Sequence, residues 1–454
     1  MLATDRSFAR LVDYGGGTLS PEIFSSPELY EQELEQIFAR CWLFVGHESQ
    51  IPNPGDFIRS RMGEEQVIVT RDRQRQIHVL LNSCTHRGNM VCRYDQGNAL
   101  GFQCSFHGWV FNSAGELVTL PQSGDGYDQM RKEEWGLMRA KVEVFQGSIW
   151  ATWDHNAPSF LEYLGGCDAY LKTSFVDADG SDNGAEILGS PMKWRIGMNW
   201  KVPMPDYDIT HGWTTHRSLV VGLGVGPSGA PVERSPDGGY VGRLGRRNTM
   251  QVSFPEGHTT AVEVPSEDHD GVWPDHGEYD DWPIIRQYLR DKYEARKRRL
   301  GVLAGLGEGP HIFPNLGFFG RVIRVLHPEG PASTEMWSYF LVDKAAPQAV
   351  KDAMARYYEH WYGPGGMTQK DDMENWYVLT RWTKGHMTRK LRLNAQLGLG
   401  KPPLDGPSTF GLPGLWAPSY SDENTRRFYQ RWAEVMQARA WDDLRVKHPV
   451  RYEQ

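Results

Sequence analysis

The sequence predicts an α+β protein with a β-rich N-terminal module and a larger domain in which helical patterns alternate with strands. Its 454 residues correspond to about three domains of ordinary size, or to two of which one is large. From residue 42 to residue 154, short β-type runs are separated by turns. Beyond this module, strands such as 320–326 and 335–343 lie between helical patterns, which is typical of an α+β domain.

The first predicted helix begins at Ser26-Pro27-Glu28, which combines a Ser cap, a Pro in the first turn and an acidic residue at the positive end of the helix dipole. The apolar residues that follow have near-helical spacing and include Cys41, so we expect Cys41 to lie in the core. The β-type runs of the module are 66–70, 77–82, 109–112 and 142–153. The closing helices are expected at 347–361, 371–384 and 422–447.

The composition is that of a soluble, mildly acidic globular protein, with 39% apolar residues, 23% charged residues and a net charge of −8. An acidic balance argues against a nucleic-acid partner, because binding to phosphates usually requires an excess of Lys and Arg. There is no apolar run of 18 residues, and the first residues lack an apolar signal core. We therefore expect no membrane span and a cytoplasmic location.

The five cysteines are odd in number and sparse for this length. A disulfide framework is therefore disfavoured, and a cysteine cluster in a reducing compartment indicates either a metal site or core thiols. The histidines next to the cysteines distinguish these two roles.

Two cysteines and two histidines occur in a characteristic pattern inside the β-rich module. The pattern is Cys-x-His, 17 residues, then Cys-x-x-His, and its members are Cys84, His86, Cys104 and His107. In a Rieske [2Fe-2S] centre two Cys hold one iron and two His hold the other. A Cys₂His₂ zinc site uses the same residue types, so the types alone leave zinc as an alternative.

The residues around the pattern favour the iron-sulfur cluster. Gly88 and Gly108 follow the two Cys/His pairs and suit a close approach of backbone N–H groups to the cluster sulfides. Trp109 could shield one face of the cluster from water. Cys92 matches no ligand position and is expected to be a small buried hydrophobe.

A second group of candidate ligands follows Asn199-Trp200-Lys201. His211 and His216 are candidates for the two-histidine, one-carboxylate triad that holds Fe(II) in non-haem oxygenases. Five residues on a regular helix place side chains roughly 140° apart, so both could bind one metal only if the helix is distorted, for which Gly212 is a plausible point. Considered alone, such a pair is more often two ordinary polar histidines, and the acidic helix start at Asp371-Asp372 is more often a cap.

The cluster motif together with Asp-Asp-x-Glu-Asn at 371–375 resembles the α (large, catalytic) subunit of aromatic-ring-hydroxylating Rieske dioxygenases, and the resemblance covers nearly the whole chain. It implies a Rieske domain plus a catalytic domain with an antiparallel sheet and helices. We expect an N-terminal helical segment at 1–41 that packs on the catalytic domain, a Rieske domain at 42–160 and a catalytic mononuclear iron domain at 161–454. The family assembly implied is an α₃β₃ hexamer with a separate small β subunit.

The resemblance also implies residue roles. The [2Fe-2S] ligands are Cys84 and Cys104 on one iron and His86 and His107 on the other. The mononuclear Fe(II) ligands are His211, His216 and Asp372. Asp208 matches the family Asp that links a cluster-ligating His of one subunit to an iron-ligating His of its neighbour, which predicts the chain His107, Asp208, His211. The sequence departs from the family in the shortened segment 202–207 and in Thr210, where a Tyr is usual.

The implied activity is NAD(P)H- and O₂-dependent cis-dihydroxylation of a polycyclic or substituted aromatic hydrocarbon, with electrons arriving through a ferredoxin reductase and a ferredoxin. Met204, Tyr207, Trp213, Phe313 and Leu316 suit a flat apolar substrate. The alternatives are a phthalate-like or benzoate-like aromatic-acid dioxygenase, for which Arg217 could pair with a carboxylate, and a Rieske monooxygenase or demethylase. Two further alternatives are a pure electron-transfer protein and a zinc-stabilised interaction protein.

Overall fold

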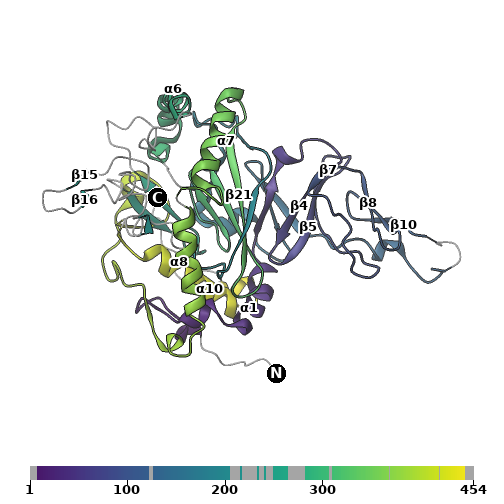
Figure 1. Cartoon of the computed structure of the whole chain (residues 1–454), viewed down its shortest axis with the longest axis horizontal. Helices are drawn as coiled ribbons and strands as arrows, with labels where there is room; N and C mark the ends of the chain where they lie inside the picture. Colours follow the sequence, from purple (N-terminus) through teal and green to yellow (C-terminus); the bar gives the residue numbers. More distant parts are fainter. Residues whose placement is uncertain are drawn as a thin grey trace. The chain divides into compact units, whose positions relative to one another are not determined.

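The computed structural model describes residues 8–121, 126–204, 215–216, 233–234, 240–241, 249–263, 282–305, 309–367, 369–418 and 420–444. The chain forms two compact units, a smaller one of residues 33–160 and a larger one that combines residues 1–32 with 161–454 (Figure 1). In the described residues, no helix is long and apolar enough to cross a lipid bilayer. The division into segments 1–41, 42–160 and 161–454 stays a prediction.

The smaller unit is rich in β-structure, as the β-type runs predict, and its described residues form three antiparallel sheets. Their strand orders are β6-β5-β4-β7, β10-β9-β8 and β11-β12-β3. The strands are β3 (Leu43–His47), β4 (Asp56–Met62), β5 (Glu65–Arg71), β6 (Ile77–Leu81), β7 (Gln96–Asn98), β8 (Gly101–Gln103), β9 (Val110–Asn112), β10 (Leu117–Thr119), β11 (Lys141–Phe145) and β12 (Ser148–Thr152). The first Cys/His pair follows β6, and the second pair lies between the antiparallel strands β8 and β9.

The predicted single run 142–153 is a hairpin instead. The strands β11 and β12 pair from Lys141↔Thr152 to Phe145↔Ser148, and the two residues between them, Gln146 and Gly147, have φ values of 49° and 78°. Two consecutive positive φ values are typical of the tight turns that match the twist of a hairpin. A Cβ on Gly147 would lie 2.6 Å from the His47 Nε2 atom, so glycine is required there for space as well as for conformation.

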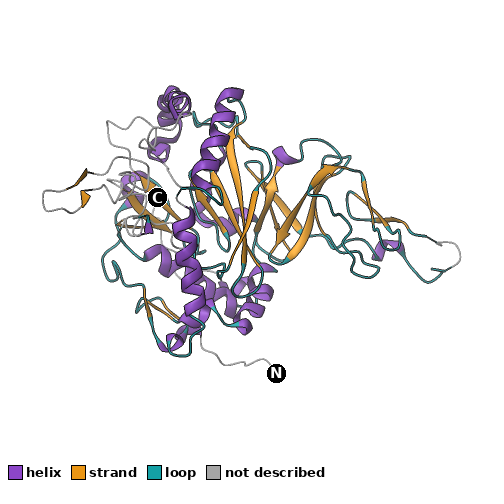
Figure 2. Ribbon diagram, in the orientation of Figure 1, coloured by secondary structure: helices purple, strands orange, loops and turns teal. Residues whose placement is uncertain are grey.

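The larger unit is built on a five-stranded antiparallel sheet, which confirms the predicted α+β class (Figure 2). Strand β21 is central, because it pairs with β13, β14 and β20, and β20 in turn pairs with β19. The bounds are β13 (Ala185–Ile187), β14 (Met192–Ile196), β19 (Leu316–Phe319), β20 (Val322–Pro328) and β21 (Thr334–Asp343). A second, three-stranded sheet has the order β18-β17-β23, with β17 (Thr249–Ser253), β18 (Thr259–Glu263) and β23 (Leu415–Pro418).

Helix α7 (Gln348–Tyr362) packs against β21 (Figure 1). Its buried residues recur at helical spacing: Val350, Ala353, Met354, Tyr357, Tyr358, Trp361 and Tyr362. The Tyr358 ring stacks on the ring of Phe340 in β21, with centroids 5.0 Å apart. This apolar stripe joins the helix to the sheet, and the chain then turns into helix α8 (Gln369–Trp382).

The other α-helices of the described residues are α1 (Pro27–Glu33), α2 (Phe160–Leu164), α3 (Asp168–Phe175), α6 (Trp282–Leu300), α9 (Gly406–Phe410) and α10 (Glu423–Gln437), and the short strands described outside the smaller unit are β1 (Val12–Asp13), β2 (Thr18–Leu19), β15 (Glu233–Arg234), β16 (Tyr240–Val241) and β22 (Leu393–Asn394). Helix α10 ends ten residues before the predicted 447. The Asp443 carboxylate accepts hydrogen bonds from the backbone N–H groups of Arg439 and Ala440. These bonds start a separate 3₁₀ turn at Trp441–Leu444, which interrupts the helix.

Candidate functional site

The two Cys/His pairs lie on two loops with the same backbone turn. In the first loop, the Cys84 N–H donates to the Asn89 carbonyl at 2.8 Å and the Gly88 N–H to the Cys84 carbonyl at 2.8 Å. In the second, the Cys104 N–H donates to the Trp109 carbonyl at 2.8 Å and the Gly108 N–H to the Cys104 carbonyl at 3.0 Å. Both glycines have φ of 73°, a left-handed conformation that glycine adopts at little cost.

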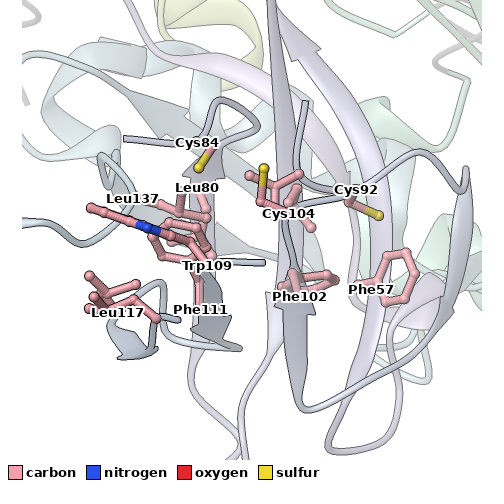
Figure 3. Packing of buried hydrophobic residues seen from close by; sticks show 13 residues of the cluster. Phe57, Leu80, Cys84, Cys92, Phe102, Cys104, Trp109, Phe111, Leu117 and Leu137 are labelled. Carbon is pink, nitrogen blue, oxygen red and sulfur yellow. The ribbon is translucent and has the colours of Figure 1, made fainter. Parts of the chain in front are cut away.

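The side chains of the two loops meet. The rings of His86 and His107 lie edge to face with centroids 4.5 Å apart. The His86 ring also stacks on Trp109, with centroids 4.8 Å apart and an interplanar angle of 9°. Cys84 and Cys104 are each 2% exposed and pack in one apolar cluster with Trp109 (Figure 3). The predicted shielding residue therefore covers one of the imidazoles directly.

The surroundings of the two loops shift the pKa values of both cysteines and of His86. Burial raises the pKa of the Cys84 thiol. At Cys104, burial also raises the pKa of the thiol. Hydrogen bonds from the backbone N–H groups of Phe106 and His107 and from the Asn89 side chain outweigh this effect, so the pKa is lowered overall. Burial, with the nearby charges of His107 and Arg87, lowers the pKa of His86.

One buried histidine nitrogen of the loops makes no hydrogen bond to the described residues. His86 Nδ1 is buried and has no hydrogen-bond partner among the described residues, which is unfavourable unless the nitrogen binds something else. Within the described ranges, no three His, Cys, Asp or Glu side chains are grouped to hold one metal ion. Two thiols and two imidazoles are the ligand types of a two-iron Rieske cluster and also of a tetrahedral zinc ion.

Cys92 lies outside this group, as predicted. It is 4% exposed, and its Sγ donates to the Tyr94 carbonyl at 3.6 Å. In Figure 3 its sulfur points away from the sulfurs of Cys84 and Cys104. The Asn82 side chain holds the backbone around Cys92 in place, because its Oδ1 accepts hydrogen bonds from the N–H groups of Val91 and Cys92. Cys92 is thus a core thiol on the far side of the loop.

The acidic helix start predicted at 371–372 lies in the first turn of α8. The helix follows a glycine turn in which a Cβ on Gly366 would lie 2.5 Å from the Trp361 carbonyl oxygen, so the chain can turn here only with glycine. Two hydrogen bonds fasten α8 to neighbouring segments: Trp194 Nε1 donates to the Met373 sulfur at 3.2 Å, and Thr380 Oγ1 accepts from the Asn199 N–H at 2.9 Å.

The structure brings His216 and Asp372 together. His216 Nε2 lies 3.8 Å from the Asp372 Oδ1 atom, and the His216 side chain is only 8% exposed. Two of the three predicted Fe(II) ligands therefore adjoin although they are far apart in the sequence. The other predicted residues of this site, His211 and Asp208, lie outside the described residues, as do Gly212 and Arg217.

Two residues that the sequence analysis does not predict as ligands also contact the predicted ligands. Asn89 Nδ2 lies 3.6 Å from the Cys104 sulfur, and Asp371 Oδ2 lies 3.4 Å from His216 Nδ1. The Asp-Asp doublet is visible in the sequence, but nothing in it says which carboxylate faces which ring nitrogen. Asn89 has no sequence signal beyond its place after Gly88.

Comparison with known proteins identifies both halves of the chain. Residues 41–139 match the Rieske [2Fe-2S] domain family, and residues 189–438 match the catalytic domain of the ring-hydroxylating α subunits. The chain belongs to the ring-hydroxylating α-subunit family. The α subunit therefore carries a Rieske [2Fe-2S] domain, and the catalytic domain of this family binds a mononuclear iron. It is an oxidoreductase of the dioxygenase class that incorporates O₂ into aromatic substrates.

Several relatives match the α subunit over nearly its whole length. The α subunit of biphenyl 2,3-dioxygenase from Rhodococcus jostii strain RHA1 is 34% identical, with 98% of this chain and 95% of the relative covered. The α subunit of benzene 1,2-dioxygenase from Pseudomonas putida is 32% identical, with 96% and 95% covered. A solved structure of naphthalene 1,2-dioxygenase with indole in its active site is 29% identical, has a TM-score of 0.83 and covers 98% and 97%. The biphenyl and benzene dioxygenase relatives are the α subunits of their enzymes.

Proposed function

We propose that this α subunit catalyses cis-dihydroxylation of a polycyclic or substituted aromatic hydrocarbon. The arene, O₂ and NAD(P)H with one proton give a cis-dihydrodiol and NAD(P)⁺, so that two electrons and two protons accompany both oxygen atoms onto adjacent ring carbons. The observation that carries the proposal is the approach of His216 to Asp372 in a chain whose smaller unit holds a Rieske motif.

The residue roles belong to the proposal. Cys84 and Cys104 would hold one cluster iron and His86 and His107 the other, within a Rieske domain of residues 42–160. His211, His216 and Asp372 would hold the mononuclear iron in the catalytic domain of residues 161–454, with the segment 1–41 packed on that domain. When bound, the cluster supplies single electrons and the mononuclear Fe(II) activates O₂.

The chain's own residues orient these ligands and keep water away. Trp109, 2% exposed, excludes water from one face of His86. Asp208 would link His107 of one subunit to His211 of its neighbour and so shorten the electron path. Normal electron transfer between cluster and iron in an Asp208→Ala variant would contradict this role.

The names of the relatives and the apolar character of the predicted pocket support a hydrocarbon substrate. Biphenyl, benzene and naphthalene are aromatic hydrocarbons, and they name the relatives' activities. The described members of the predicted pocket, Met204, Phe313 and Leu316, are each 1% exposed. A flat apolar molecule in such surroundings is held mainly by burial of its surface.

The proposal includes partners. A small β subunit would complete an α₃β₃ hexamer, and a ferredoxin with its reductase would deliver electrons from NAD(P)H. The resemblance to α subunits that belong to multi-subunit systems supports this assembly.

The deciding experiment is turnover of the reconstituted complex with ¹⁸O₂ and a panel of arenes and aromatic acids. We expect two labelled oxygen atoms in a dihydrodiol formed from a hydrocarbon, and three irons per chain, two in the cluster and one mononuclear. A single labelled atom would indicate a monooxygenase or demethylase, and turnover of phthalate-like or benzoate-like acids alone would indicate an aromatic-acid dioxygenase. Two irons per chain and no turnover would indicate a pure electron carrier.

A further inference from the structure

His216 lies between two consecutive carboxylates of α8. Its Nδ1 is 3.4 Å from Asp371 Oδ2, and its Nε2 is 3.8 Å from Asp372 Oδ1. The side chains of Asp371 and Asp372 are 25% and 15% exposed, so all three groups are largely removed from water. The two ring nitrogens therefore have different partners.

A neutral imidazole carries its proton on one ring nitrogen and a lone pair on the other, and the hydrogen bond made by one nitrogen decides which nitrogen can bind a metal. An ionised carboxylate only accepts hydrogen bonds, so Asp371 selects the tautomer that has its proton on Nδ1. The lone pair is then on Nε2, the nitrogen that faces Asp372. We propose that Asp371 is a positioning residue that holds His216 in the Nδ1–H tautomer and presents Nε2 to the mononuclear iron.

The geometry of α8 allows this division of roles. Neighbouring residues on a helix point about 100° apart, so two consecutive carboxylates can contact opposite edges of one imidazole. The Asn375 side chain donates to the Asp371 carbonyl at 2.8 Å, and the contacts of Met373 and Thr380 hold the helix in place. Both carboxylates lie in the first turn, where the helix dipole favours negative charge.

This inference rests on the proposed ligand roles of His216 and Asp372, and it competes with a simpler role for Asp371. An acidic residue in the first turn stabilises a helix through the dipole alone. In that case its removal would lower stability slightly and leave the metal site as it is. The distance to Nδ1 favours the positioning role, since a cap requires no contact with His216.

The test compares Asp371→Ala, Asp371→Asn and the control Asp352→Ala in the complete oxygenase complex. Asp352 is an exposed aspartate of α7 whose carboxylate accepts only from Gln348 among the bonds of the described residues. The readouts are the affinity for added Fe(II) after chelation, and the electron paramagnetic resonance (EPR) spectrum of the nitric oxide adduct at the mononuclear site. The EPR signal of the reduced cluster reports on folding of the smaller unit.

For Asp371→Ala we expect Fe(II) affinity to fall roughly 10- to 100-fold, the usual effect of removing a carboxylate behind a metal-ligating histidine. The nitric oxide spectrum should change, and the cluster signal should persist. Asp371→Asn keeps an acceptor oxygen without the charge and should give a smaller change in the same direction, while Asp352→Ala should match wild type. If the Ala variant does not fold, the Asn variant decides by the same two readouts.

Fe(II) affinity and a nitric oxide spectrum equal to wild type in the Asp371 variants would overturn the inference. The proposed function would survive that result if His216→Ala still lost the mononuclear iron. If His216→Ala also kept its iron, the proposed ligand set itself would be wrong. The two failures are therefore distinguishable.

Discussion

The cluster loops and the predicted iron site of α8 bring their candidate ligands together in two different ways. The cluster candidates all lie between residues 84 and 107, on two short loops that repeat one backbone turn. The contact between His216 and Asp371 spans 155 residues, and it depends on how α8 is fastened to β14 and to Asn199. The first site is thus determined mainly by local sequence, whereas the second exists only in the packed domain.

Removing one predicted ligand from either site should abolish metal binding at that site and leave the other site intact. Cys104→Ser should abolish the cluster, its visible absorbance and all turnover, because the remaining thiolate and imidazoles cannot hold both irons. The mononuclear iron should remain, so iron content should fall from three to one per chain. Cys92→Ser is the matched control and should keep the cluster, and a cluster lost in the control as well would mean that the two thiols are not distinct.

The converse change is Asp372→Ala. Loss of a carboxylate ligand should reduce mononuclear iron to a trace and lower turnover by at least about 100-fold. The EPR signal of the reduced cluster should be unchanged, since the cluster lies in the other compact unit. Iron analysis and cluster EPR check this, and a variant with full iron content would exclude Asp372 as a ligand.

Acid should weaken the larger unit. Burial lowers the pKa of His258 to about 3 and that of His311 to about 4, and the neutral His258 ring accepts from the Phe313 N–H and donates to the Tyr163 carbonyl. An unfolded histidine has a pKa of about 6.5, so below that pH the unfolded chain binds protons that the folded chain does not. The contribution of these two histidines to the free energy of unfolding is fully present above about pH 6.5 and is lost as the pH falls towards 3.

At pH 5, His258 alone should cost about 2 kcal/mol in the free energy of unfolding. Urea unfolding at pH 7 and pH 5 measures this, with far-UV circular dichroism for the helices of the larger unit and visible absorbance for the cluster. A circular dichroism midpoint that does not change between these pH values would refute the prediction.

The smallest expected effect concerns the Asn89 amide. A hydrogen bond to a cluster sulfur favours the reduced, more negative state, so Asn89→Leu should lower the reduction potential. A bond of about 1 kcal/mol corresponds to about 40 mV for one electron. Redox titration followed by EPR measures the shift. Asn98→Leu is the control, because the Asn98 side chain bonds to Pro54 and Asp56 instead; equal potentials in both variants would remove Asn89 from the tuning of the cluster.

The contrast between the sites also explains what the sequence could predict. The candidate ligands Cys84, His86, Cys104 and His107 can be picked out by their spacing, because neighbours along the chain remain neighbours in a turn, and their ligand roles stay a prediction. The fold class is confirmed, and the edges of β21 and α7 fall within one residue of the predicted ranges 335–343 and 347–361. The hairpin turn at Gln146-Gly147 was missed because Gln rarely adopts a positive φ.

The helix expected to reach residue 447 ends at Gln437, because the Asp443 carboxylate binds the backbone N–H groups of Arg439 and Ala440. The spacing of apolar residues does not reveal such a side-chain bond to the backbone, so the sequence could not predict this end. The role of Asp371 could not be predicted either. Its place in the first turn is visible in the sequence, but the ring nitrogen that it faces depends on contacts between residues 155 positions apart.

The short span of the cluster loops has a consequence for biosynthesis. A chain leaves the ribosome from its N-terminus, and domains fold as units in that order. The smaller unit ends at residue 160, so its cluster loops can close while more than half of the chain is still to be translated. The predicted iron site cannot close until α8 has been made and packed. Cluster insertion can therefore begin early in translation, whereas iron loading has to wait until α8 has been made and packed.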